Sequence, residues 1–306
     1  MKKNPAMLLS TTVVFCLTVL ILLYPAHCLY FACNGLNLWF QKMIPALFPF
    51  MVLSGIMIRM NLTNSFVKLL KPAFVPVFQV SSHCIYTILI GFLCGFPMGA
   101  HVTAQLYERN RLSKKEAEFL LAFCNNIGPV YFLSFALPTI GITQKLPALF
   151  GMYGLPLFYG LFLRYTIYRK AFAQKEPLPE DRESGISFLQ SLDESVMSSL
   201  TGITKLGGYM IVFNLLNIVP SLLLKDETVK AVIGCILEIT GGLKALGEKS
   251  PFWALCLLPF GGLSCIAQTY SMIKDTDLSL KNYVFHKLFL TVFSFFYYFF
   301  LVGKAY

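Results

Sequence analysis

The chain carries little charge. Only 13% of its 306 residues are Asp, Glu, Lys or Arg, whereas charged residues make up about a quarter of a typical soluble domain. Hydrophobic residues account for 56% of the chain, and its mean hydropathy is +0.66. So few charges cannot cover the surface of a soluble globule of this size, and lipid is therefore the expected solvent. The composition predicts an integral membrane protein.

Motifs of the common enzyme classes are also missing. The chain contains no GxSxG, HExxH or Walker-type phosphate-binding sequence, and its four histidines are scattered along it. The missing phosphate loop argues against an ATP-driven pump within these residues. We therefore expect a protein that is not an enzyme.

The nine cysteines indicate neither a disulfide framework nor a metal site. No two of them form a CxxC pair, and most lie in apolar segments, where free Cys packs as a small hydrophobe. The net charge of +10 does not indicate nucleic-acid binding either, because the basic residues lie in short loops between apolar segments. We expect no metal, no nucleic-acid partner and no cofactor, with Na⁺ or H⁺ left open as a coupling ion.

What the chain does contain is a series of long apolar segments. A spanning helix needs about 20 mostly apolar residues. The segments that reach or approach this length are 7–24, 41–60, 84–106, 117–138, 146–166, 201–224, 229–247, 251–272 and 283–303. Their apolar runs do not alternate as the strands of a membrane barrel would. The predicted fold class is an all-α polytopic membrane protein in contact with lipid.

The first segment is predicted to be a retained transmembrane helix rather than a signal peptide. Lys2 and Lys3 precede an apolar run longer than the core of a signal peptide, and His27 lies where cleavage would require small residues. We therefore place the N-terminus in the cytoplasm, with helix 7–24 leading outward.

The basic turn at 108–115 predicts a re-entrant hairpin. If segment 84–106 simply crossed the membrane, this turn would lie outside, against the positive-inside rule. A hairpin over 67–106 that enters and leaves on the cytoplasmic side removes the conflict, and its glycines and prolines allow the helix to break. After the turn, Ser113 and Glu116 form a capping-box pattern that starts the next helix.

The second half of the chain weakly repeats the first. The sequence AQLY at 104–107 matches AQTY at 267–270, and the same offset places Gly99 on Gly262. A polar turn and a Leu-Ser pair follow each match. We predict two inverted-topology repeats, the plan of many secondary transporters. The second hairpin enters from outside, and the turn at 274–281 lies outside.

This interpretation divides the chain into four parts. They are an N-terminal helix with an outer loop at 1–40, a first repeat at 41–166 with hairpin 67–106, a mixed-charge cytoplasmic linker at 167–200, and a second repeat at 201–306 with hairpin 229–272.

Polar residues within apolar segments are costly in lipid and are the first functional candidates. In the first half they are Gly95, Pro97, Gly99, His101, Gln105, Asn125, Asn126 and Gly128. Pro129 leaves the carbonyl of Asn125 without its helical donor, and freed carbonyls with carboxamides provide the parts of a midplane site for a solute or Na⁺. The alternatives are an interfacial His101 and a helix kink at which the asparagines bridge neighbouring helices.

In the second half the candidates are Glu238, Gly262, Ser264 and Gln268. Glu238 lies in an apolar run, where a carboxylate can carry a proton or bind an ion. It can equally be an acid near a hairpin tip, paired with Lys244 or facing water. The pair Gly261-Gly262 can equally serve close helix packing.

The stretch from Ile90 to Phe132 resembles the signature region of the YlbJ-type sporulation integral membrane proteins, which are related to proteins with the nucleoside-recognition (GATE) domain. Further matching stretches are LWFQKMIPALFPFMVLSG at 38–55, ILEITGGLKAL at 236–246 and PFGGLSCIAQTYSMIKDTDLSLKNYVFHKL at 259–288. The resemblance covers most of the chain from about residue 36. Two departures are a shorter chain and His101 in place of an expected Lys.

The resemblance implies a transporter-like membrane protein of spore-forming bacteria that moves dipicolinic acid between compartments. It also implies motif roles for Gly95, Pro97, Gly99, Asn125, Asn126, Gly128, Pro129, Glu238, Gly241, Gly262, Ser264 and Gln268. We expect alternating-access transport of a small polar or anionic solute across the cell membrane or a forespore-surrounding membrane. A nucleoside–cation symporter, a non-transporting sporulation scaffold or receptor, and a homo-oligomer stay open.

Overall fold

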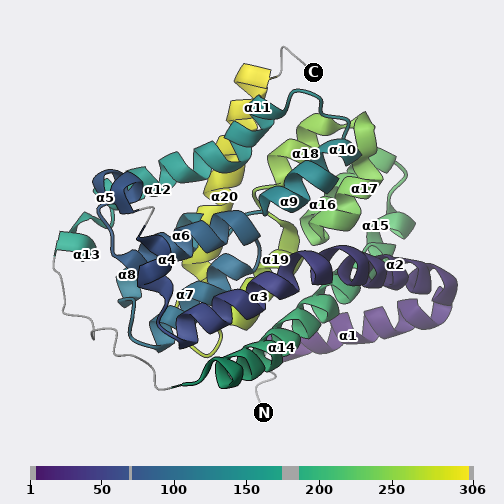
Figure 1. The fold of residues 1–306 in the computed structure, drawn as a ribbon. Helices are drawn as coiled ribbons and strands as arrows, with labels where there is room; N and C mark the ends of the chain where they lie inside the picture. Colours follow the sequence, from purple (N-terminus) through teal and green to yellow (C-terminus); the bar gives the residue numbers. More distant parts are fainter. Residues whose placement is uncertain (1–4, 69–70, 174–185, 303–306) are drawn as a thin grey trace.

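The computed structural model describes residues 5–68, 71–173 and 186–302, which form helices joined by turns and loops, with no strand among them (Figure 1). Up to residue 139 the elements are α1 (Pro5–Leu23), α2 (Pro25–Leu38), η1 (Trp39–Met43), α3 (Ile44–Arg59), α4 (Thr63–Val67), α5 (Lys71–Phe78), α6 (Ser82–Cys94), α7 (Met98–Glu108), α8 (Lys114–Phe123), α9 (Pro129–Tyr131), η2 (Phe132–Ala136) and α10 (Leu137–Thr139). They continue with α11 (Lys145–Leu149), η3 (Phe150–Gly154), α12 (Leu155–Tyr165), α13 (Arg169–Ala173), α14 (Phe188–Leu215), α15 (Ile218–Leu223), α16 (Glu227–Leu237), α17 (Ile239–Leu246), η4 (Gly247–Lys249), α18 (Pro251–Leu257), α19 (Gly262–Ile273), α20 (Leu280–Tyr297) and η5 (Tyr298–Val302). The all-α fold class is confirmed for these residues.

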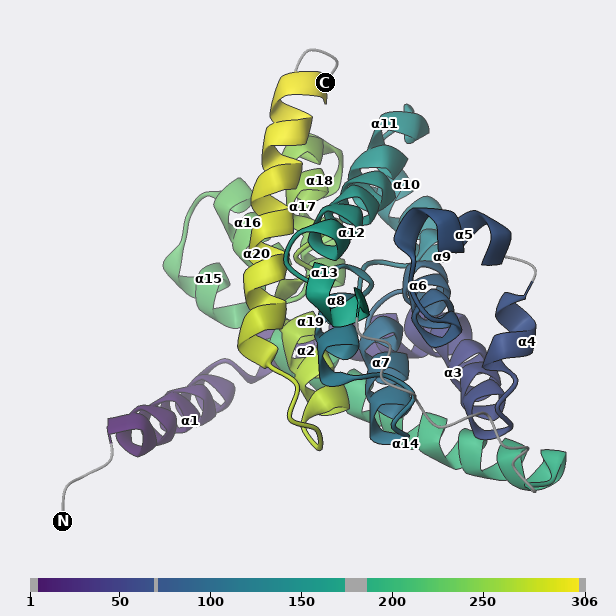
Figure 2. The same ribbon diagram turned by 90° about the vertical axis from the view of Figure 1, so that its left-hand side faces the viewer.

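Among the described residues, five helical stretches are long and apolar enough to cross a membrane. They are Pro25–Arg59, Lys145–Tyr165, Phe188–Leu223, Pro251–Ile273 and Leu280–Phe300. Large apolar side chains are exposed along them, as expected for surfaces that face lipid rather than water. The shorter α1 extends away from the other helices (Figure 2). The structure thus supports the membrane character that the composition predicts.

Two short helix pairs reverse direction inside the molecule. In hairpin A (residues 82–108), α6 and α7 pack on each other and are joined at 95–97, where Gly95 has a φ of +84° that favours glycine. In hairpin B (residues 227–246), α16 and α17 are joined at Glu238 alone. Hairpin B closes tightly because a Cβ on Gly242 would meet the backbone of Cys235.

Two longer helices are interrupted near their middle. Broken helix A (residues 114–139) stops after Phe123 and starts again at Pro129, where the sequence predicts a break. Broken helix B (residues 251–273) is interrupted between Leu257 and Gly262. A proline at the first position of a helix has no N–H to leave unpaired, so Pro129 starts the second part of broken helix A without loss.

The prediction that residues 229–272 form one hairpin is wrong. This stretch contains most of hairpin B and nearly all of broken helix B, separated by a chain reversal at 247–250. Gly247 has a φ of +52° and ends α17, and Pro251 begins α18. These are ordinary helix stop and start signals.

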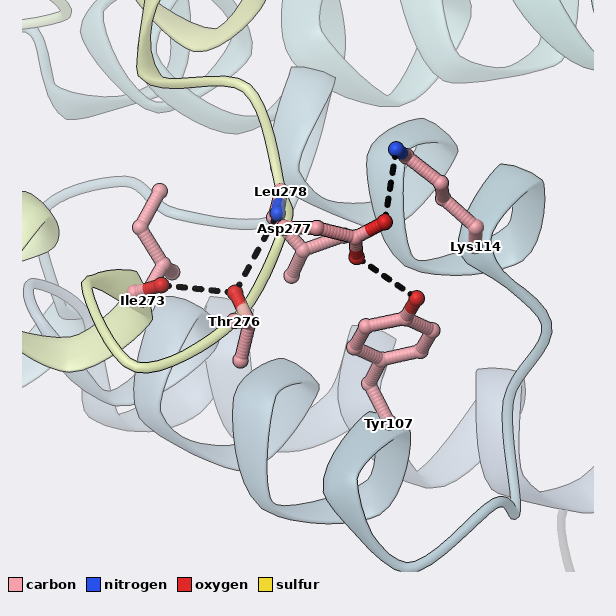
Figure 3. A network of polar contacts seen from close by, with 6 residues as sticks. All are labelled: Tyr107, Lys114, Ile273, Thr276, Asp277 and Leu278. Carbon is pink, nitrogen blue, oxygen red and sulfur yellow. Dashed lines mark hydrogen bonds and ion pairs between the residues drawn. The ribbon is translucent and has the colours of Figure 1, made fainter.

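The turns at 108–115 and 274–281 were predicted to lie on opposite sides of the membrane, and this is also wrong. Lys114 Nζ lies 2.8 Å from Asp277 Oδ2, and the Tyr107 hydroxyl donates a hydrogen bond of 2.7 Å to Asp277 Oδ1 (Figure 3). Both turns therefore lie at one end of the molecule, called here the Asp277 end. The missed reversal at 247–250 accounts for the error, because it turns the chain back once more.

The structure also refines two boundaries. The capping box at Ser113 is confirmed, since its hydroxyl accepts from Glu116 N and the Glu116 side chain accepts from Ser113 N. Helix α14 begins at Phe188, capped by Ser187, inside the stretch assigned to the linker at 167–200. Linker residues 174–185 lie outside the described residues.

Candidate functional site

The turns of both hairpins and the interruptions of both broken helices meet in the interior. A Cβ on Gly95 of hairpin A would meet the backbone of Gly128 in broken helix A. A Cβ on Gly262 of broken helix B would meet backbone atoms on both sides of Glu238 in hairpin B. These glycines therefore allow four irregular backbone segments to approach each other, a direct packing role that the sequence left open for Gly262.

A small cavity of about 70 Å³, called the central cavity, adjoins all four segments. Its lining residues are Met43, Ala46, Leu47, Phe50, Leu93, Cys94, Phe96, Ile127, Gly128, Val130, Tyr131, Leu206, Met210, Glu238, Ile239, Thr240, Cys265 and Gln268. Three predicted site residues thus line it: Gly128, Glu238 and Gln268. Clefts that bind drug-sized ligands are roughly 300–1,000 Å³, so this cavity has to widen before it can hold a solute of that size.

Glu238 is buried at the turn of hairpin B, and both of its carboxylate oxygens accept hydrogen bonds. Its Oε1 accepts from the backbone N of Thr240 at 3.1 Å, and its Oε2 accepts from the N of Gly241 at 2.7 Å and Asn214 Nδ2 at 3.0 Å. A carboxylate is favoured at the N-terminus of α17, which it caps. Glu238 therefore lies at the hairpin tip, and its described partners are backbone and Asn214 rather than Lys244.

A second and larger cavity lies on the other side of Asn214. This vestibule has a volume of about 440 Å³. It is lined by Tyr30, Phe31, Asn34, Leu38, Asn214, Asn217, Pro220, Ser221, Glu227, Thr228, Lys230, Ala231, Gly234, Gly241, Gly242, Lys244, Ala245, Leu246, Lys249 and Ser250. Since Asn214 and Gly241 line the vestibule and both donate to Glu238, this carboxylate and its partners separate the vestibule from the central cavity.

Asn125 joins three elements. Its Oδ1 accepts from the backbone N of Ala100 in α7 at 3.3 Å, and its Nδ2 donates to Thr269 Oγ1 at 2.9 Å and to the Tyr283 hydroxyl at 3.2 Å. The side chain is completely buried. This arrangement matches the alternative in which the asparagine bridges neighbouring helices.

Asn126, also completely buried, contacts a lysine that the sequence interpretation missed. Lys287 of α20 is 0% exposed, and its Nζ donates to Asn126 Oδ1 at 2.9 Å. The ammonium lies 4.6 Å from the centre of the Phe96 ring and 5.9 Å from that of Tyr283. The signal was present, because Lys287 is a single charge inside the apolar segment 283–303.

The remaining predicted residues lie around this centre rather than in the cavity. Pro97 precedes the first turn of α7, a Cβ on Gly99 would meet the backbone of Cys124, and Ser264 accepts from Gln268 Nε2 at 3.0 Å. His101 and Gln105 are partly buried on α7, outside the residues that line the central cavity. Within the described ranges no three His, Cys, Asp or Glu side chains are grouped as a metal site requires.

Comparison with known proteins finds that the chain is similar to a bacterial sporulation protein. The chain is 23% identical over 339 aligned residues to the sporulation integral membrane protein YlbJ of Bacillus subtilis (strain 168), covering 96% of this chain and 82% of that protein. No protein-family model matches the chain, and no solved structure matches it. The similarity to a YlbJ-type sporulation integral membrane protein, indicated first by short motifs, therefore extends over nearly the whole chain.

Proposed function

We propose that this protein is a secondary-transporter-like membrane protein that moves a small anionic solute by alternating access. The observation that carries the proposal is the meeting of two hairpin turns and two helix breaks around a central cavity, with a vestibule separated from it by one carboxylate. Broken helices near mid-depth are a common way to build a solute site in transporters, because they bring helix ends and freed backbone groups to the solute.

The contacts between the hairpins and the broken helices are consistent with an inverted repeat. The helices that correspond in it differ from those that the sequence predicts. Hairpin A, broken helix A and α11–α12 would correspond to hairpin B, broken helix B and α20. At the Asp277 end, the start of α8 lies beside the loop that follows α19. Beyond the opposite end of broken helix A, Gly141 packs against Glu248, which follows α17. The two hairpins then enter from opposite ends, as in many transporters.

Charge placement supports an orientation for this arrangement. The Asp277 end and its neighbouring helix ends carry Arg59, Arg109, Arg111, Lys114, Lys115 and Arg164. By the positive-inside rule this end faces the cytoplasm, and the vestibule opens on the opposite side. The orientation agrees with a cytoplasmic N-terminus if α1 and the helix 25–59 each cross the membrane once before Arg59.

The vestibule favours an anionic solute. Its lining includes Lys230, Lys244 and Lys249 but a single acid, Glu227, whose Oε1 lies 2.7 Å from Lys230 Nζ. A cavity whose lining carries an excess of one sign of charge concentrates ions of the opposite sign. A dipicolinate-like carboxylate fits this charge, and it is also the solute class that the resemblance to sporulation proteins implies.

Gln268→Ala tests the central cavity as the solute site. The only hydrogen bond that Gln268 makes among the described side chains is to Ser264 on the same helix, so its removal spares the contacts between helices. In proteoliposomes reconstituted with the purified variant, we expect uptake of dipicolinate to be at least about 10-fold slower than with the wild type. This is the scale of one lost hydrogen bond to a charged group. Gln144→Ala, at an exposed position outside the cavity, is the matched control.

The outcomes separate the alternatives. Wild-type uptake by Gln268→Ala would exclude this residue from the site. Sodium-driven uptake of nucleosides in place of dipicolinate would favour a nucleoside–cation symporter. A lack of uptake of either solute class by the wild type would favour a non-transporting membrane component of sporulation.

A further inference from the structure

The ammonium of Lys287 lies in the interior, and no carboxylate of the described residues pairs with it. Within the described part of the chain, the ion pairs join Arg59 to Glu194, Lys114 to Asp277 and Lys230 to Glu227. An ammonium group carries three N–H donors, and Lys287 gives one of them to Asn126 Oδ1. Burial without a paired carboxylate disfavours the charged form of a lysine, so an anion bound here would also stabilise the ammonium.

The neighbours of Lys287 that the structure describes are uncharged. Asn126 in broken helix A offers a carboxamide oxygen, and the rings of Phe96 and Tyr283 offer their electron-rich faces. These groups partly compensate a positive charge, but none supplies a negative one. An anion brought to Lys287 would therefore complete the site.

Phe96 separates Lys287 from the central cavity. The ring lies beneath the ammonium, and the same residue lines the cavity together with Cys265. Phe96 lies in the turn of hairpin A, next to Gly95 and the start of α7. A shift of this turn that widens the cavity would carry the ring away and bring the ammonium into contact with a bound solute.

We propose that Lys287 is the anchor for the negatively charged group of the solute, and that Phe96 covers this anchor while the central cavity is narrow. This inference rests on the proposed transport function and adds to it the residue that selects for charge. The two uncommitted N–H groups would donate to a carboxylate oxygen, and Asn126 would keep the amine in place. The described residues near Lys287 contribute no carboxylate, which leaves the solute as the partner.

The test compares binding of charged and neutral probes to the purified full chain. The probes are pyridine-2,6-dicarboxylate, pyridine-2-carboxylate and the neutral pyridine-2,6-dicarboxamide, each added during thermal unfolding in detergent. We expect the dicarboxylate to stabilise the wild type more than the diamide does. In Lys287→Met the dicarboxylate should bind roughly 10- to 150-fold more weakly, the scale of a charge-assisted hydrogen bond, and its preference over the diamide should disappear.

Three further variants keep the test decisive. Lys281→Met removes an exposed lysine from the same helix and should bind like the wild type. Phe96→Ala removes the cover and should bind the dicarboxylate more tightly while the diamide changes less. If Lys287→Met fails to fold, Lys287→Arg keeps the charge in a different shape and should retain the preference for the dicarboxylate with reduced affinity.

The anchor and the transport function can fail separately. If Lys287→Met keeps the full preference for the dicarboxylate, the anchor is wrong although transport stands. If the wild type and Phe96→Ala respond to neither carboxylate, and proteoliposomes take up none, then the anionic solute and the anchor are both overturned.

Discussion

At the residue scale, the interior polar groups divide into those that hold helices together and those that face a cavity. Asn125 makes hydrogen bonds to three residues on three helices, whereas Gln268 faces the central cavity and bonds within its own helix. Both are intramembrane carboxamides and look alike in the sequence. Their substitutions should therefore have different consequences.

Asn125→Ala should lower stability rather than act on transport alone. It leaves the N–H of Ala100 without its acceptor and removes a donor to Thr269 and Tyr283, all in the interior. A buried polar group left without its partner costs about 1–3 kcal/mol. Unfolding in mixed micelles measures this, with the exposed Asn282→Ala as control. An unchanged unfolding midpoint for Asn125→Ala would contradict the bridging role.

The sequence was informative about which residues are buried and polar, but not about their partners. Asn125, Asn126, Glu238 and Gln268 were all identified because polar groups in apolar segments are rare. Their pairing could not be predicted, since Asn126 and Lys287 lie far apart in the chain and only the fold brings them together. Lys287 was not predicted as a site residue, because it was counted only as part of the apolar segment 283–303.

At the element scale, the glycines in the breaks determine how closely the irregular segments approach. Gly95 combines a φ of +84° with a neighbouring backbone at Gly128, so a side chain there is opposed by both conformation and space. By contrast, Gly208 lies in the middle of α14, and a Cβ there would meet no atom within 4 Å. The two positions therefore form a matched pair.

Gly95→Ala should destabilise the protein by at least about 1 kcal/mol, the cost of placing Ala at a positive φ, with a further loss from contact with Gly128. Gly208→Ala should stabilise it by up to about 1 kcal/mol, because Ala is the better helix former. Thermal unfolding of both variants in one detergent gives the comparison. A gain in stability for Gly95→Ala would show that hairpin A and broken helix A do not pack as described.

The breaks of the first half were easier to predict than those of the second. Gly95, Pro97, Gly128 and Pro129 are dense local signals, and the chain breaks where they occur. Hairpin B turns at the single residue Glu238 within an apolar run, and the sequence indicated a hairpin tip there only as one of two alternatives. Gly247 and Pro251 mark the chain reversal that follows, and the prediction of one hairpin over 229–272 overlooked both.

At the scale of the whole molecule, the two ends differ. The Asp277 end is held by contacts from Asp277 to Lys114 and Tyr107 across segments distant in the chain (Figure 3), whereas the opposite side contains the vestibule. The hydrogen bond from Lys114 lowers the pKa of Asp277 below its ordinary value, and the same bond raises the pKa of Lys114. For an acid with a lowered pKa, the contact persists at neutral pH and is lost only as the pH falls through that lowered value.

Asp277→Asn should loosen this end of the molecule at both neutral and mildly acidic pH. The measurement is amide deuterium exchange of the turns at 108–115 and 274–281, made at pH 7 and at pH 4. The wild-type turns should stay protected at pH 4 relative to the variant, because the lowered pKa keeps Asp277 ionised there. Asp275→Asn, an exposed acid in the same turn, should exchange like the wild type. If Asp277→Asn leaves exchange unchanged, the contact is a surface pair that does not hold the two halves together, and closure of this end has to come from helix packing alone.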